Sequence, residues 1–226
     1  MTTSSDAPGA DLLRDAYSAF GRVILELDQD QSWTGTGCRG WTIRDLTYHC
    51  LADAQRGLVA LHSPSGETAD RDAVSYWRDW APTEEGAAQG RRFSRVGGSM
   101  FLIWGQLRDL YLETSAAVID AAQSTSAKQL VATQRHVLTA DDLLRTLCVE
   151  ATIHHLDMVL DLPGSEGPGP SGLHEVRRVL DGLVGHQIAT EWADERYARV
   201  ATGRGRLTAE EASELGPLAL RFPLFS

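Results

Sequence analysis

The sequence predicts an all-α protein, built as a four-helix bundle with an accessory helix and a short C-terminal tail. Apolar residues recur three or four positions apart through four long segments, which is the period of an amphipathic helix. These segments span residues 10–28, 42–62, 98–122 and 139–162. The chain shows no series of short segments in which apolar and polar residues alternate, the pattern that predicts β-strands. Amphipathic helices without strands bury their apolar faces against one another, so a helical bundle follows.

The first helix follows a leader, residues 1–9, that is expected to be disordered. Its apolar period begins near Ala10 and ends near Asp28. A loop with three glycines over residues 31–40 then separates it from the second helix.

The second and fourth long helices begin with the same sequence signal. Thr42 and Asp45 are placed to form a capping box, in which each side chain bonds the backbone N–H of the other residue. Thr139 and Asp142 repeat this spacing at the start of the fourth helix. These two starts are therefore the best defined in the chain.

The remaining segments are predicted as connections and short helices. Residues 63–96 are rich in glycine, proline and charge, and we expect a long connection there with a short helix near 70–80. A polar linker is expected over 123–138. After a glycine- and proline-rich break, a fifth helix is expected over 173–190, and a short capped helix begins at Thr208.

Length and composition favour one globular domain with a small addition. The chain has 226 residues, of which 42% are hydrophobic and 23% are charged. We expect a helical bundle over residues 10–190 and an extension over 191–226 that packs on it. The formal net charge of −10 argues against nucleic acid or an anionic membrane as a partner, since either calls for a basic surface.

Location follows from features that the sequence lacks. No run approaches the ~18 apolar residues that a membrane span requires. The first residues contain neither the basic nor the apolar region of a signal peptide. The three cysteines, an odd number without a C-x-x-C motif, predict free thiols in a reducing compartment, and the cytoplasm is expected.

The fourth long helix carries a polar stripe on a surface that is otherwise almost entirely apolar. At 100° per residue, Glu150, His154, Asp157 and Asp161 fall on one line. A helix that is apolar on nearly all sides is normally buried. Buried ionisable groups are costly unless they are paired or bound to a metal. This stripe therefore needs a partner.

The sharper hypothesis for that partner is a divalent metal held by His49 together with Glu150 and His154. Imidazole and carboxylate groups suit zinc, and three protein ligands leave a coordination position for water or substrate. The alternative is that Glu150 and His154 form a buried hydrogen-bonded pair, with His49 at the edge of the surface. His155 lies on the opposite side of the helix and is left out of the ligand set.

The sequence gives weaker evidence for other functional groups. Cys38 lies in the glycine-rich loop, but the sequence shows no base beside it, so a structural thiol is expected. The turn Gly203-Arg204-Gly205-Arg206 has the composition of an anion site, although a solvated turn is favoured. No P-loop, G-x-G-x-x-G, G-x-S-x-G or H-E-x-x-H motif is present.

Two segments resemble the helices that bear the metal in a known family. The segment WTIRDLTYHCLADAQR with its lead-in from Cys38, and LLRTLCVEATIHHLDM, resemble the DinB-like superfamily. More narrowly, they resemble the N-terminal domain family of mycothiol-dependent maleylpyruvate isomerase, over roughly residues 10–190. The resemblance implies a DinB-like bundle with metal ligands at His49, Glu150 and His154 and a catalytic aspartate at Asp157. It also implies Zn²⁺ as the metal and mycothiol as the thiol cosubstrate.

The function that the resemblance implies is a metal-dependent thiol S-transferase. Such an enzyme activates a low-molecular-weight thiol as a zinc-bound thiolate for attack on a small electrophile, in detoxification or specialised biosynthesis. One alternative is a mycothiol-dependent maleylpyruvate cis–trans isomerase. That enzyme has a C-terminal α/β domain, and the residues after 190 are too few for a comparable one. The other alternative is a non-catalytic DinB-like stress protein that binds a metal or ligand. A monomer or homodimer is expected, and the substrate-binding residues are not predicted.

Overall fold

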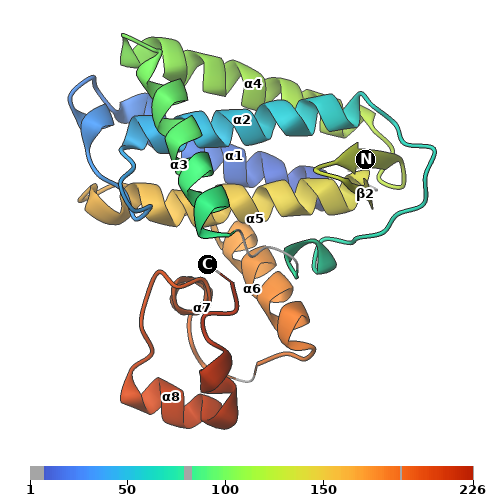
Figure 1. Cartoon of the computed structure of the whole chain (residues 1–226), viewed down its shortest axis with the longest axis vertical. Helices are drawn as coiled ribbons and strands as arrows, with labels where there is room; N and C mark the ends of the chain where they lie inside the picture. Colours follow the sequence, from blue (N-terminus) through green and yellow to red (C-terminus); the bar gives the residue numbers. More distant parts are fainter. Residues whose placement is uncertain (1–7, 79–82, 189, 226) are drawn as a thin grey trace, which may run out of the picture.

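A computed structural model describes residues 8–78, 83–188 and 190–225, and it confirms the all-α fold. Four long helices lie side by side as a bundle (Figure 1). They are α1 (Pro8–Glu26), α2 (Ile43–Leu61), α4 (Trp104–Ser124) and α5 (Ala140–Met158). Within the bundle α1 packs on α5 and α2 packs on α4, while α2 also contacts α5. Of the expected leader, residues 8 and 9 belong to α1, and residues 1–7 lie outside the described part.

A further helix, α3 (Glu84–Ser99), occupies much of the segment for which a long connection was predicted. The periodic apolar pattern misses it because its buried positions are small: Ser94, Gly97 and Gly98. A Cβ atom at Gly97 would lie within the ring of Tyr48, so only glycine allows this close approach to α2. The prediction of a helix from residue 98 was therefore wrong at its start, because one helix ends there and α4 begins later.

Part of the predicted polar linker is a β-hairpin. Strand β1 (Leu130–Thr133) pairs antiparallel with β2 (His136–Thr139), and Val131 faces Leu138 across the pair. Both of these side chains are fully buried. The turn residues Gln134 and Arg135 have positive φ angles of 46° and 73°. This turn usually contains glycine or asparagine, and neither is present, so the sequence signal for a hairpin is weak.

The expected helix starts are found, one of them in a different form. The capping box of Thr42 and Asp45 is present at α2. At α5, Thr139 Oγ1 accepts a hydrogen bond from the backbone N–H of Asp142 at 3.1 Å. The Asp142 carboxylate, however, accepts from the Thr139 hydroxyl and from the backbone N–H of Ala73. Only half of the second box forms, because these two donors occupy the Asp142 carboxylate in place of the backbone N–H of Thr139.

The last part of the chain lies on one side of the bundle (Figure 1). It contains α6 (Pro170–Val184), α7 (Asp194–Ala201) and α8 (Ala209–Leu215). Apolar side chains of α5, α6 and α7 form one core cluster, which includes Ile153, Val176 and Tyr197. The C-terminal segment is thereby held against the helix that carries the polar stripe. Among the described residues, no helix combines the length and hydrophobicity that a membrane span requires.

The short helix predicted near 70–80 is only a 3-10 turn, Ser75–Trp77, within the described residues. Residues 79 and 80 lie outside the described part. The turn is held by Asp72, whose carboxylate accepts hydrogen bonds from the backbone N–H groups of Val74 and Ser75. A single turn that is capped in this way is favoured locally, but it carries too few apolar residues to extend.

Candidate metal centre and active site

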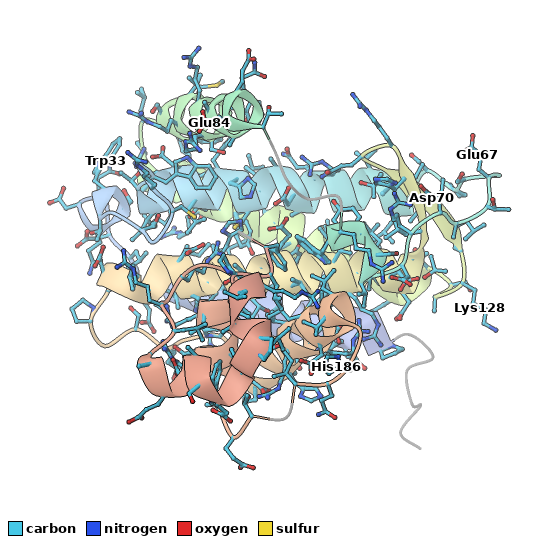
Figure 2. The ribbon with its side chains drawn as sticks, turned by 60° about the horizontal axis from the view of Figure 1, so that its bottom comes forward. Trp33, Glu67, Asp70, Glu84, Lys128 and His186 are labelled. Atoms are coloured by element: carbon cyan, nitrogen blue, oxygen red, sulfur yellow. The ribbon has the colours of Figure 1, made fainter. Side chains whose placement is uncertain are left out.

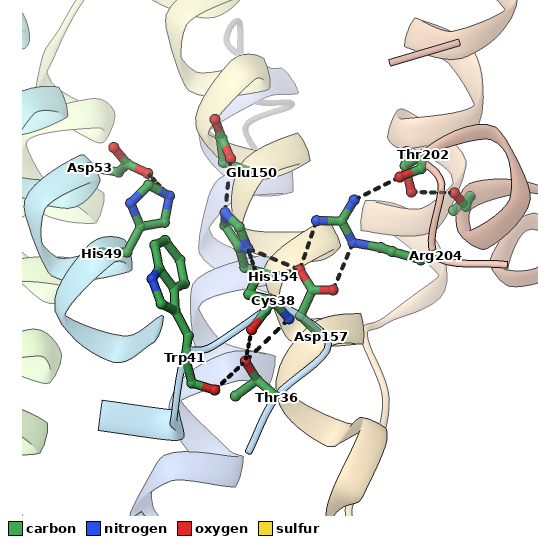
Figure 3. A network of polar contacts seen from close by, with 11 residues as sticks. Thr36, Cys38, Trp41, His49, Asp53, Glu150, His154, Asp157, Thr202 and Arg204 are labelled. Atoms are coloured by element: carbon green, nitrogen blue, oxygen red, sulfur yellow. Dashed lines mark hydrogen bonds and ion pairs between the residues drawn. The ribbon is translucent and has the colours of Figure 1, made fainter. Parts of the chain in front are cut away.

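The three predicted metal ligands meet where α2 packs on α5 (Figure 3). His49 comes from α2, and Glu150 and His154 lie one turn apart on α5. The two imidazole rings are 4.7 Å apart between centroids and nearly perpendicular. His154 Nε2 lies 3.3 Å from Glu150 Oε2. One ligand atom from each residue lies within 4.8 Å of the others, so the three groups can hold one cation.

The third member of the stripe, Asp157, fixes the orientation of His154. Its Oδ2 atom lies 3.1 Å from His154 Nδ1. This contact turns Nε2 toward Glu150 and His49, where a cation would be held. A carboxylate on the second ring nitrogen is the usual partner of a metal-binding histidine, because it fixes the tautomer and the ring.

Arg204 holds Asp157 with two hydrogen bonds, and the sequence did not predict this. The Arg204 Nε and Nη2 atoms donate to the two carboxylate oxygens at 2.8 and 2.7 Å. The solvated turn that was favoured for Gly203–Arg206 was therefore the wrong interpretation for this arginine. The signal was present in the two glycines around Arg204, but the partner lies 47 residues away.

The charge of Asp157 is fixed by these contacts. Burial alone would raise the pKa of this carboxyl group, but hydrogen bonds from His154 and Arg204 outweigh burial and hold the pKa well below its usual range. Asp157 is thus an ionised group whose two oxygens are both bound. This geometry suits a residue that positions His154 better than one that carries a proton.

Cys38 lies beside the same groups, half-buried at the end of the loop before α2. Its Sγ atom donates to Asp157 Oδ2 at 3.2 Å and lies 3.7 Å from His154 Nδ1. The sequence shows no base beside this thiol, but folding brings the loop onto α5 and places His154 and Asp157 next to it. Cys38, His154 and Asp157 form a second group of possible metal ligands. Arg204 neutralises Asp157, so charge favours the group formed with His49 and Glu150.

The helix α2 repeats the pairing of imidazole and carboxylate four residues apart. His49 Nε2 lies 3.3 Å from Asp53 Oδ2, and Arg56 Nη1 donates to Asp53 Oδ1 at 2.9 Å. Burial raises the pKa of Asp53 against the influence of His49, and the nearby Glu150 raises it further. Asp53 was not among the predicted site residues, and its spacing from His49 was the signal for it.

Two residues of the fourth predicted helix do not contribute. Asp161 is exposed and follows the end of α5 in a 3-10 turn, so the prediction that it continues the buried stripe was wrong. His155 is buried on the other face, where Nε2 bonds the carbonyl oxygen of Glu166 at 3.0 Å. His155 thus lies outside the cluster, as predicted.

The protonation of the three groups fits a divalent cation. Burial lowers the pKa of His49, which favours the neutral imidazole that a metal requires. Burial raises the pKa of Glu150, but its contacts with His154 and His49 outweigh burial and favour the carboxylate. Burial alone would lower the pKa of His154. Its hydrogen bonds with Asp157, Cys38 and Glu150 outweigh burial and raise this pKa well above the usual value. A cation at Nε2 would take the place of that proton.

The indole of Trp41 covers the cluster on one side. Its ring centroid lies 5.1 Å from that of His49 and 6.4 Å from that of His154. Trp41 itself is buried among the apolar side chains between α1, α2 and α4. This wall lowers the polarity around the imidazoles, which strengthens electrostatic interactions at the site.

Gly37 sets how closely the Cys38 loop approaches α5. Its backbone N–H donates to the Asp157 carbonyl at 2.9 Å. A Cβ atom at Gly37 would lie 2.6 Å from Asp157 Oδ1 and 3.2 Å from its Cα atom. Any larger residue must therefore push the loop, and Cys38 with it, away from the site.

We predict that Gly37→Ala lowers the free energy of unfolding by about 1–3 kcal/mol, the usual cost of inserting a methyl group into a packed position. Urea denaturation measures this change. Gly66→Ala is the matched control, because no atom lies within 4 Å of a Cβ atom there. Equal effects of the two substitutions would contradict the close contact of Gly37 with α5.

The chain is similar to known proteins in sequence and in fold. The family model for the mycothiol maleylpyruvate isomerase N-terminal domain matches residues 13–159. Two solved structures of the mycothiol-dependent maleylpyruvate isomerase match the fold, one of them a variant with a histidine replaced by alanine. Each is 20% identical to this chain in sequence. The matched part is 80% of this chain and 72% of the solved chain, and the TM-scores are 0.55 and 0.54. No curated protein matches the chain.

Proposed function

Since the chain belongs to the mycothiol maleylpyruvate isomerase N-terminal domain family, and is thus a thiol-dependent isomerase or transferase, we propose that it isomerises maleylpyruvate or a similar cis-unsaturated acid with mycothiol. The observation that carries this proposal is the extent of the family match. The matched segment, residues 13–159, contains His49, Glu150, His154 and Asp157 together with the helices that position them. The arrangement of these four residues supports the proposal of a metal centre with an oriented histidine.

We propose Zn²⁺ as the cation held by His49, Glu150 and His154. Held by two neutral imidazoles and one carboxylate, the ion would retain positive charge and would favour the thiolate form of a thiol at the site. Asp157 keeps His154 in the tautomer that offers Nε2. Arg204 holds the Asp157 carboxylate in place through hydrogen bonds to both of its oxygens.

The proposed reaction uses the thiol sulfur as a reversible nucleophile. The thiolate forms a C–S bond to one carbon of the cis double bond. The π electron pair of the double bond moves onto the conjugated carbonyl group. The remaining C–C single bond rotates. The electron pair then returns, the C–S bond breaks, and the trans acid and the thiolate are released, so no thiol is consumed. Trp41 supports these reaction steps because its indole keeps water from one side of the imidazoles.

The S-transferase that the sequence resemblance first suggested shares the addition step. It differs because the adduct accepts a proton and leaves with the sulfur attached. The comparisons do not confirm this function, and they favour the isomerase alternative. The two reactions are distinguished by whether the thiol is consumed.

The test combines the zinc-loaded protein with mycothiol and maleylpyruvate. We expect the trans isomer to accumulate, measured by chromatography, while the thiol concentration stays constant. Loss of one thiol for each substrate consumed would assign S-transfer instead. If the loaded protein changes neither maleylpyruvate nor a generic electrophile such as monochlorobimane, the function as an enzyme is refuted in favour of a binding protein.

A further inference from the structure

We propose that a basic cavity between α3 and the loop before α2 binds a small organic polyanion, a molecule with two or more phosphate or carboxylate groups. The cavity has a volume of about 690 Å³, within the range of ~300–1,000 Å³ that is usual for small-molecule sites. Arg39, Arg91, Arg92 and Arg95 line it, and none of its described lining residues is acidic. This site does not use the metal cluster and does not depend on the proposed isomerase activity.

The charge of the cavity is unusual for this chain. The protein carries 31 acidic and 21 basic residues, and many of its arginines are paired with carboxylates, as Arg14, Arg145 and Arg196 are. Within the described residues, no ion pair is found for any of the four cavity arginines. Their positive charges therefore repel one another without a protein partner, and an anionic ligand would relieve this repulsion.

The spacing of the arginines suits one ligand. Arg91 and Arg95 lie four residues apart and thus on one face of α3, with Arg92 beside them. Arg39 comes from the loop on the other side of the cavity. Guanidinium groups bind phosphate and carboxylate through two parallel hydrogen bonds, so several of them on two walls select a molecule with more than one anionic group.

Part of the cavity wall is apolar, which favours an organic molecule over an inorganic ion. Val96 and Met100 line it and remain 59% and 75% exposed. Val96 directly follows Arg95 on α3, and Met100 is the residue after the end of this helix. The carbon skeleton of a phosphate ester or polycarboxylate would cover these side chains while its charged groups face the guanidinium groups.

The cavity is connected to the metal cluster through Trp41. Trp41 Nε1 donates a hydrogen bond to the Arg91 carbonyl oxygen at 3.3 Å, and the same indole packs on His49. The helix α3 lies on the outside of the bundle in Figure 2, where Glu84 marks its start. A ligand in the cavity is therefore reachable from solvent and can be detected through the indole N–H of Trp41.

The test is calorimetric titration of the whole protein with pyrophosphate and with citrate. We expect binding of at least one anion with a stoichiometry of one. The variant Arg91→Gln/Arg92→Gln/Arg95→Gln should bind it at least ten times more weakly. The matched control is Arg14→Gln/Arg22→Gln/Arg108→Gln, which changes the net charge equally at surface positions outside the cavity, and it should bind nearly as well as the original protein. A preference for pyrophosphate assigns phosphate esters, and a preference for citrate assigns polycarboxylates.

Three outcomes would overturn the proposal. The first is no binding of either anion at millimolar concentration. The second is an equal loss of affinity in the control, which would show a general effect of net charge. The third is binding to phosphatidylserine vesicles without binding of either soluble anion, which would assign the surface to membranes. Circular dichroism checks the fold of each variant, and Arg39→Gln, which lies outside every helix, replaces the triple variant if that variant unfolds.

Discussion

Glu150→Ala should remove the cation from the protein and abolish thiol-dependent turnover. Glu150 supplies the only carboxylate of the proposed ligand group, and its Oε2 atom faces His154 Nε2 at 3.3 Å. Without it, two imidazoles remain, too few ligands for a stable divalent site. We expect the metal content by elemental analysis to fall from about one to below about 0.1 per chain. The rate of thiol-dependent turnover should fall on the order of a thousandfold, since the cation contributes several kcal/mol to such reactions.

The matched control for this prediction is His174→Ala. His174 lies on α6 with 77% of its side chain exposed, and its Nδ1 atom lies 3.5 Å from Asp194 Oδ2. Its removal should leave metal content and turnover unchanged. Added Zn²⁺ should raise the Tm of the original protein and of this control, because a ligand that binds only the folded state stabilises it. A metal content near one per chain in Glu150→Ala would refute the proposed centre.

Much of the site could be predicted because its residues depend on local sequence. The cap at Thr139 fixes where α5 begins, and a regular helix then places Glu150 and His154 on one face. The capping box at Thr42 does the same for His49 on α2. The family resemblance added that these faces meet, which spacing alone left open. The assignment of His49, Glu150 and His154 as ligands stays a prediction.

The features that were missed depend on contacts between distant segments. Arg204 reaches Asp157 only because α6 and α7 turn back onto α5, and no local pattern records that path. Cys38 gained its partners in the same way. The helix α3 was missed because glycines, instead of apolar residues, form its buried face. Asp161 was misplaced because the regular helix ends at Met158, after which positions no longer follow 100° per residue.

Arg204→Gln should produce the largest loss of stability in the C-terminal segment. Asp157 has only 2% of its side chain exposed, and Arg204 supplies a permanent positive charge that compensates it. Removing one partner of a buried ion pair leaves the other charge without compensation, which costs about 3–5 kcal/mol. We expect urea denaturation to show a loss of this size. The metal affinity should also fall by about 10–100-fold, because Asp157 would no longer be held against His154.

Arg206→Gln provides the comparison that separates this ion pair from a general effect of the turn. Arg206 lies two residues after Arg204, also between α7 and α8, and its side chain is exposed. Its loss should change the free energy of unfolding by less than about 0.5 kcal/mol. If the two variants unfold alike and retain the same metal affinity, Arg204 does not stabilise Asp157. If Arg204→Gln alone loses both stability and metal affinity, the C-terminal segment is part of the metal centre, since Arg204 orients a ligand that it does not touch.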